Sequence, residues 1–164
     1  MRIVSIRFLA FVLFFVALTS NVAHPQSAAA LSLDGDITQS TSWTLDDLKK
    51  LPRTTQKVTN ASGSQDIYEG VDLAVLLVIG GVPLKSDLKG KDVAKYLHAE
   101  GQDGFVAAFS LPEFDSGSFL IADTLNGSPL PSGVGPLQII SPGEVRHSRW
   151  IKDLILLRIE TSVK

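Results

Sequence analysis

The sequence has 164 residues, of which 45% are hydrophobic and 20% charged, and it contains no cysteine. Its formal net charge is −2, from 15 Lys and Arg against 17 Asp and Glu. A chain of this length forms one domain with its own core. The absence of cysteine excludes disulfides, and a mildly acidic chain without a basic stripe argues against nucleic acid as a partner.

The N-terminal residues are predicted to be a secretory signal peptide. Two arginines precede an apolar run at residues 8–18, which is short for a membrane span of about 20 residues. Residues 28–30 are three alanines, which form an A-x-A cleavage site. We therefore expect a signal peptide at 1–30 and one exported domain at 31–164, in the periplasm or outside the cell and free of the membrane. An uncleaved signal anchor is the alternative.

Two short helices are predicted in the first half of the domain. Thr44 can cap the first, with Asp47 three residues later in a capping-box relation. Asp72 can cap the second, at residues 73–79, which ends at two glycines. This second helix is apolar on every side, which indicates that it is buried.

Strand patterns occupy most of the remaining chain. The predicted strands are residues 31–33, 54–59, 66–68, 93–99, 104–109, 118–122, 137–140 and 150–159. A helical turn is expected at residues 111–114. The fold class is therefore α+β, with a mostly β, mixed-sheet or barrel-like core and two or three short helices.

Residues 126–142 (NGSPLPSGVGPLQIISP) form the most distinctive segment. Asn126 and Gly127 both tolerate positive φ and indicate a tight turn. Gly133 and Gly135 let the backbone pass close to a ligand or to another strand. The segment is typical of a cradle for an extended cofactor, although ordinary β corners are built from similar residues.

Three pieces of sequence, in this order, point to one family. They are residues 69–73 (EGVDL), residues 103–105 (DGF), and the cradle with its NGSPLP and GPLQIISP elements. Over residues 31–159 the chain resembles the molybdopterin-binding domain of the sulfite-oxidase type, in a short, exported, single-domain form. The resemblance implies that fold, molybdopterin as a possible cofactor and, if the chain is an enzyme, a molybdopterin-dependent oxidoreductase.

The chain departs from this family at two chemically important positions. The family's enzymes ligate molybdenum through a cysteine thiolate, the soft ligand that such a centre uses, and our alignment places Ala61 there. Ser62 is only a weak substitute, since a serine in a Gly/Ser turn usually serves the turn. The family often has an arginine after the Gly-Pro of the cradle, where this chain has the neutral Gln138. No metal ligand is therefore predicted.

A basic cluster, formed by residues 146–149 and Lys152, follows the cradle. It supplies candidate contacts for an anionic ligand, because the planar guanidinium of arginine matches the geometry of oxyanions. The alternative is a solvated loop before the last strand. The predicted cofactor-binding residues are Gly133, Gly135, Gln138, Arg146, His147, Arg149 and Lys152. The aromatic residues that could serve function are Trp43, Tyr68, Phe105 and Trp150, with core packing as the alternative.

Three functions remain open from the sequence. The first is a binding or accessory module for a pterin-like or other anionic ligand, or for a partner protein, without protein-ligated molybdenum. The second is a molybdenum oxidoreductase whose metal is held by the cofactor itself. The third is a structural or interaction protein of the cell envelope. A fold alone does not decide between them.

Overall fold

The computed structural model describes residues 29–115, 119–141, 143–144 and 146–162. Residues 1–28 of the predicted signal peptide lie outside this range. The backbone N–H of Ala30 donates to the carbonyl of Trp43 at 2.8 Å. Within the described ranges, no helix has the length and apolar character needed to cross a membrane.

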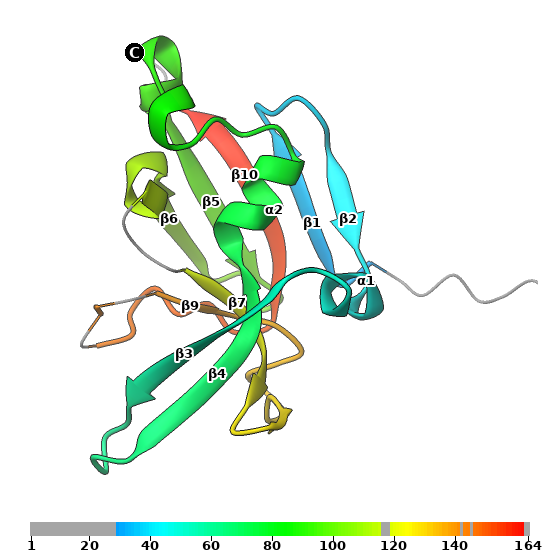
Figure 1. Ribbon diagram of the computed structural model, residues 1–164. Helices are drawn as coiled ribbons and strands as arrows, with labels where there is room; N and C mark the ends of the chain where they lie inside the picture. Colours follow the sequence, from blue (N-terminus) through cyan, green and yellow to red (C-terminus); the bar gives the residue numbers. More distant parts are fainter. Residues whose placement is uncertain (1–28, 116–118, 142, 145, 163–164) are drawn as a thin grey trace, which may run out of the picture.

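The first sheet places the first and last strands of the domain side by side. Its strands, in spatial order, are β2 (Thr41–Trp43), β1 (Leu31–Gly35), β10 (Leu154–Thr161), β5 (Lys95–Gly101) and β6 (Val106–Ser110). β1 and β10 run parallel, whereas the other neighbours are antiparallel. The sheet is therefore mixed, as predicted, and fills the upper part of Figure 1.

The second sheet is antiparallel and carries the candidate site. Its strands are β3 (Arg53–Thr59), β4 (Gln65–Asp72), β7 (Leu120–Leu125) and β8 (Ser128–Pro129), with β9 (Gln138–Ile140) also paired to β7. The β3–β4 hairpin extends away from the first sheet (Figure 1). Much of the hairpin therefore has no contact with the first sheet (Figure 1).

Both predicted helices form, and their caps are those that the sequence indicates. α1 (Leu45–Lys49) begins with a capping box, in which Thr44 Oγ1 accepts from the Asp47 N–H at 3.1 Å. α2 (Leu73–Ile79) begins at Asp72, whose side chain accepts from the Ala74 N–H at 2.9 Å. Three short 3₁₀ helices complete the helical elements of the described residues: η1 (Lys85–Asp87), η2 (Gly90–Ala94) and η3 (Leu111–Asp115).

Some sequence-based expectations need correction. α2 is not buried on every side, because only one of its faces meets the sheets, and Val78 remains 61% exposed. The strand expected from residue 93 begins at Lys95, since η2 takes the two preceding residues. The very short strands β2 and β8 have too few residues to produce a sequence pattern and were not predicted.

Two apolar clusters lie on opposite faces of the second sheet. Successive residues of a strand point to opposite faces, so Ile121 of β7 joins the large core while Leu120 and Ala122 face the other side. The large core lies between the two sheets and under α2. The smaller cluster joins Leu120, Ala122 and Ile140, with Val58, Tyr68 and Trp150 packed against it.

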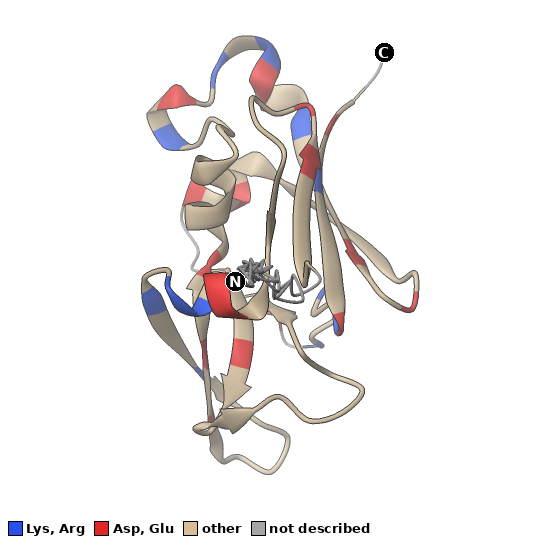
Figure 2. Ribbon diagram, turned by 90° about the vertical axis from the view of Figure 1, so that its right-hand side faces the viewer, with Lys and Arg blue, Asp and Glu red and all other residues tan. Residues whose placement is uncertain are grey.

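Charged residues are spread over the whole domain. Figure 2 shows Lys and Arg interspersed with Asp and Glu along the ribbon, rather than gathered in one continuous stripe. Local pairing is common, as between Arg158 and Asp34, whose side chains form two hydrogen bonds of 2.7 and 2.9 Å. Recognition of a ligand therefore depends on local groups rather than on a field of one sign.

Candidate functional site

Trp150 is the centre of the candidate site, on the face of the second sheet that carries the smaller cluster. Its ring meets Tyr68 edge to face, with centroids 5.6 Å apart and an interplanar angle of 88°. The imidazole of His147 stacks on it at 3.7 Å and 11°. The indole Nε1 donates to the carbonyl of Ser141 at 3.0 Å. The indole ring is thus fixed in place. The stacked imidazole shows that a planar group fits against its face.

Two cavities meet at the stacked pair of His147 and Trp150. The first, which we call the Gln56 cavity, has a volume of about 400 Å³ and is lined by Gln56, Lys57, Val58, Thr59, Ser141, Gly143, Glu144, His147 and Trp150. The second, which we call the Lys152 cavity, has a volume of about 380 Å³ and is lined by Tyr68, Leu125, Pro131, Val134, Gln138, His147, Trp150 and Lys152. A ligand on the indole can reach either cavity.

Several residues singled out in the sequence converge on the Lys152 cavity. Gln138, His147 and Lys152 all line it. Gln138 is buried, with only 4% of its surface exposed. Gly133 has a φ of +78°, which glycine adopts without the strain that a side chain brings. Val134, which follows it, reaches the cavity wall.

Arg149 belongs to the support of this site rather than to its walls. Its guanidinium donates to Glu144 and, at 3.0 Å, to Glu113, and lies 4.6 Å from the centre of the Phe109 ring. Burial acts to lower the pKa of Arg149, but the hydrogen bonds to the two carboxylates outweigh it and raise the pKa. Arg149 therefore fastens the loop before Trp150 to η3. Arg146 is exposed.

The position aligned with the family's metal ligand lies at the tip of the β3–β4 hairpin. Ala61 and Ser62 are exposed there, just beyond Thr59, the last β3 residue of the Gln56 cavity. Asn60 holds the turn: its side-chain oxygen accepts from the Ser62 hydroxyl at 2.7 Å and from the Ser64 N–H at 3.0 Å. Ser62 thus serves the turn.

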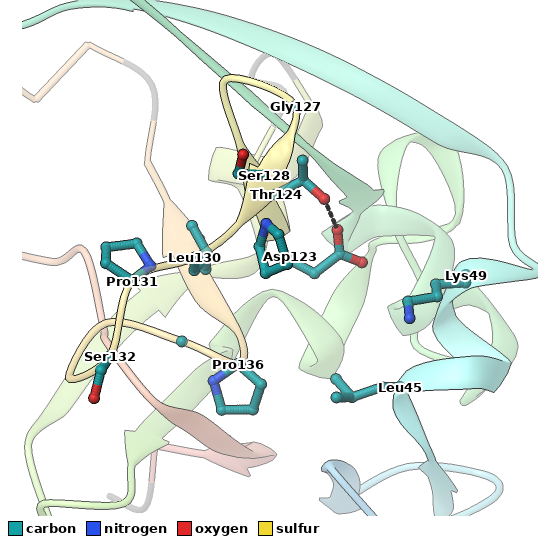
Figure 3. Close-up of a pocket in the computed structure, with 12 residues that line it drawn as sticks. Leu45, Lys49, Asp123, Thr124, Gly127, Ser128, Leu130, Pro131, Ser132 and Pro136 are labelled. Atoms are coloured by element: carbon teal, nitrogen blue, oxygen red, sulfur yellow. Dashed lines mark hydrogen bonds between the residues drawn. The ribbon is translucent and has the colours of Figure 1, made fainter.

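The cradle segment also lines a third cavity, on the side of α1. This cavity has a volume of about 590 Å³, and Figure 3 shows Leu45 and Lys49 across from the proline-rich loop. Asp123 lies in it with the Thr124 hydroxyl donating to its carboxylate at 2.7 Å. Both carboxylate oxygens of Asp123 also accept from Arg53, at 2.7 and 2.6 Å. Its charged group is therefore already satisfied within the protein.

Gln56 and Glu144 are two residues of the Gln56 cavity that the sequence did not predict. Gln56 lies in β3 opposite Tyr68 of β4, and Glu144 accepts from the Ser141 hydroxyl at 3.3 Å. Neither belongs to a recognisable motif. The only available signal was the alternation within β3, which places Gln56 on the same face as Val58.

Comparisons with known proteins agree with this architecture. No curated protein matches the sequence. The family model described as "Oxidoreductase molybdopterin binding domain" matches residues 20–163. The crystal structure of the sulfane dehydrogenase SoxCD from Paracoccus pantotrophus is similar in fold, with a TM-score of 0.63 and 22% sequence identity. The match covers 80% of this chain and 38% of the SoxCD chain, so the chain spans well under half the length of that protein. The chain belongs to the oxidoreductase molybdopterin-binding domain family.

Proposed function

We propose that this chain is an exported binding module that holds a planar, pterin-like, anionic ligand on the indole of Trp150, without molybdenum ligated by the protein. The observation that carries the proposal is the His147–Trp150 stack, because the imidazole at 3.7 Å shows that the indole face can hold a flat ring. The ligand would take this position when the exposed His147 side chain turns away. The two cavities on either side give room for a bicyclic ring and its substituent.

The residues at Trp150 fit the organic part of a molybdopterin cofactor. An aromatic face, two side-chain amides and the cation of Lys152 suit a polar, flat and anionic ligand. The donor set does not fit a molybdenum centre held by the protein, since the sequence has no cysteine. Within the described part of the chain, no three His, Asp or Glu side chains are grouped to hold a metal ion. We therefore propose that the protein binds the pterin without ligating molybdenum itself.

Replacing Trp150 by leucine is expected to weaken pterin binding about 5- to 150-fold, because stacking of a flat ring on an aromatic side chain contributes about 1–3 kcal/mol. The affinity is measured by calorimetry with pterin as the titrant. Trp43→Phe is the matched control, since Trp43 is 6% exposed in the large core and its replacement leaves the site intact. Equal affinity of Trp150→Leu and the natural chain would show that the ligand, if any, binds elsewhere.

Export is part of the same proposal. It is supported by Arg2 and Arg7 near the N-terminus, by the apolar run at residues 8–18 and by the alanines at residues 28–30. When the full chain is expressed with its own N-terminus in a Gram-negative host, we expect the protein in the periplasmic or culture fraction, with Leu31 as the first residue by N-terminal sequencing. A cytoplasmic protein that still begins at Met1 contradicts this part of the proposal.

A further inference from the structure

Gln56 is one of the polar residues that line the Gln56 cavity. It lies in the middle of β3, and its cross-strand partner is Tyr68, the residue that meets Trp150 edge to face. Its side chain lines the same cavity as Ser141, Glu144 and Trp150. A flat ligand stacked on the indole therefore has one of its edges beside the Gln56 amide.

The oxygen of this amide is in an unusual position. Gln56 Oε1 is buried, yet it accepts no hydrogen bond from any residue that the structure describes, and it is the single buried side-chain polar atom of which this is true within those residues. Buried polar groups nearly always have a partner, so each exception calls for an explanation. A half turn about the last torsion of the side chain exchanges the amide oxygen and the amide nitrogen, and a ligand that donates to the oxygen would favour the orientation in which it can be reached.

Glu144 and Ser141, which line the same cavity, are also acceptors, whereas its lining residue Lys57 is a donor. The Glu144 carboxylate is 14% exposed and already accepts from Arg149 at both oxygens, so its remaining capacity to accept is on Oε2. The hydroxyl of Ser141 already donates its proton to Glu144 at 3.3 Å, so its remaining capacity is to accept. The carbonyl of Ser141 accepts from the Trp150 indole. A ligand edge rich in N–H donors matches Gln56, Glu144 and Ser141, whereas an edge of carbonyl oxygens in the same place would face these acceptors.

We propose that Gln56, together with Glu144, selects the ligand by accepting hydrogen bonds from an amino and ring N–H edge, so that the site prefers 2-amino heterocycles to their 2-oxo analogues. The inference rests on the proposed function, because it needs a flat ligand on Trp150. It assigns the donor edge of the ligand to the Gln56 cavity. The opposite cavity holds Lys152 and contains no Asp or Glu among its described lining residues, whereas the Gln56 cavity is lined by Glu144 as well as Lys57. The anionic substituent is therefore assigned to the Lys152 cavity.

The test compares two bicyclic ligands that differ at one position. Pterin has an amino group where lumazine has a carbonyl, and the ring systems are otherwise the same size. Calorimetric titration of the natural chain is expected to give about tenfold tighter binding of pterin, since a site built to hydrogen-bond one group rejects the analogue that lacks it. Gln56→Leu is expected to reduce that preference to about threefold or less, while Gln56→Glu, which keeps an oxygen acceptor, retains it.

Gln65→Leu is the matched control, because Gln65 belongs to the same hairpin and does not itself line the Gln56 cavity. Its amide donates to the hydroxyl of Thr59 at 2.9 Å, and the preference of this variant for pterin should equal that of the natural chain. Gln56→Met repeats the test with an unbranched apolar side chain, and melting temperatures verify that each variant is folded. An unchanged preference in the folded Leu or Met variant overturns the role of Gln56, as does equal binding of both ligands by the natural chain. A natural chain that binds neither ligand refutes the proposed function itself.

Discussion

Replacing Gly70 by alanine is expected to lower the free energy of unfolding by about 3 kcal/mol, since forced overpacking against immobile atoms costs on this order. A Cβ atom at this position would lie 1.9 Å from the carbonyl oxygen of Ile121 and 2.7 Å from the Cα of Ala122. Both atoms belong to the backbone of β7, so relief requires β4 and β7 to separate. Urea denaturation followed by circular dichroism measures the change.

Gly63→Ala is the control for this experiment. Gly63 has a φ of +84°, and a Cβ there meets no atom within 4 Å. The substitution therefore introduces backbone strain alone, which costs about 1 kcal/mol. If the two alanine variants are equally stable, the close approach of β4 to β7 at Gly70 is not as the structure shows it.

The second large effect is expected at the ion pair of Arg53 and Asp123. These side chains are 25% and 10% exposed, and the guanidinium donates to both carboxylate oxygens. Asp123→Asn should lower the free energy of unfolding by about 2 kcal/mol near neutral pH, because it removes the bidentate partner of a mostly buried guanidinium and leaves that guanidinium only the more exposed Glu69, at 3.2 Å. Asp46→Asn is the matched control, since Asp46 is 80% exposed and lies 3.8 Å from Lys49, a pair worth at most about 0.5 kcal/mol.

The same pair makes stability depend on pH. Burial acts to raise the pKa of Asp123, but hydrogen bonds from Arg53 and Thr124 outweigh it and hold the pKa below the usual 3.8. A carboxyl group with a lowered pKa in the folded state stabilises the protein above its unfolded pKa, and this contribution is lost as the pH falls through the folded value. The stability gap between the natural chain and Asp123→Asn should therefore narrow below pH 3.8. A constant gap down to about pH 2 contradicts the role of the pair.

Local chemistry made part of the fold predictable from the sequence. The capping box at Thr44 and the cap at Asp72 are formed as expected, because each depends on residues within one helical turn. Asn126 and Gly127 adopt φ values of +51° and +78°, which confirms the predicted turn. The side-chain oxygen of Asn126 also accepts from the N–H of Ile67 at 2.8 Å, which ties this turn to β4. The mixed, mostly β architecture follows from the same signals.

Long-range contacts account for what the sequence could not show. Arg149, in the loop before Trp150, meets Glu113 of η3 only in the folded chain. No local pattern therefore indicates that Arg149 supports the site rather than contacting the ligand. In the sequence, Gln56 is one polar residue within a predicted strand. Its position beside Tyr68 results from the pairing of β3 with β4. The parallel pairing of β1 with β10 likewise depends on the whole chain.

The claim that the protein binds a pterin without ligating molybdenum is tested most directly by chemical analysis of the purified protein. The full chain is expressed with its own N-terminus in a host that makes molybdopterin, and molybdenum and released pterin are both quantified per mole of protein. We predict close to one pterin per chain and no stoichiometric molybdenum. Stoichiometric molybdenum would contradict this prediction and favour an oxidoreductase, whereas a chain that carries neither and binds no added pterin would favour an interaction protein.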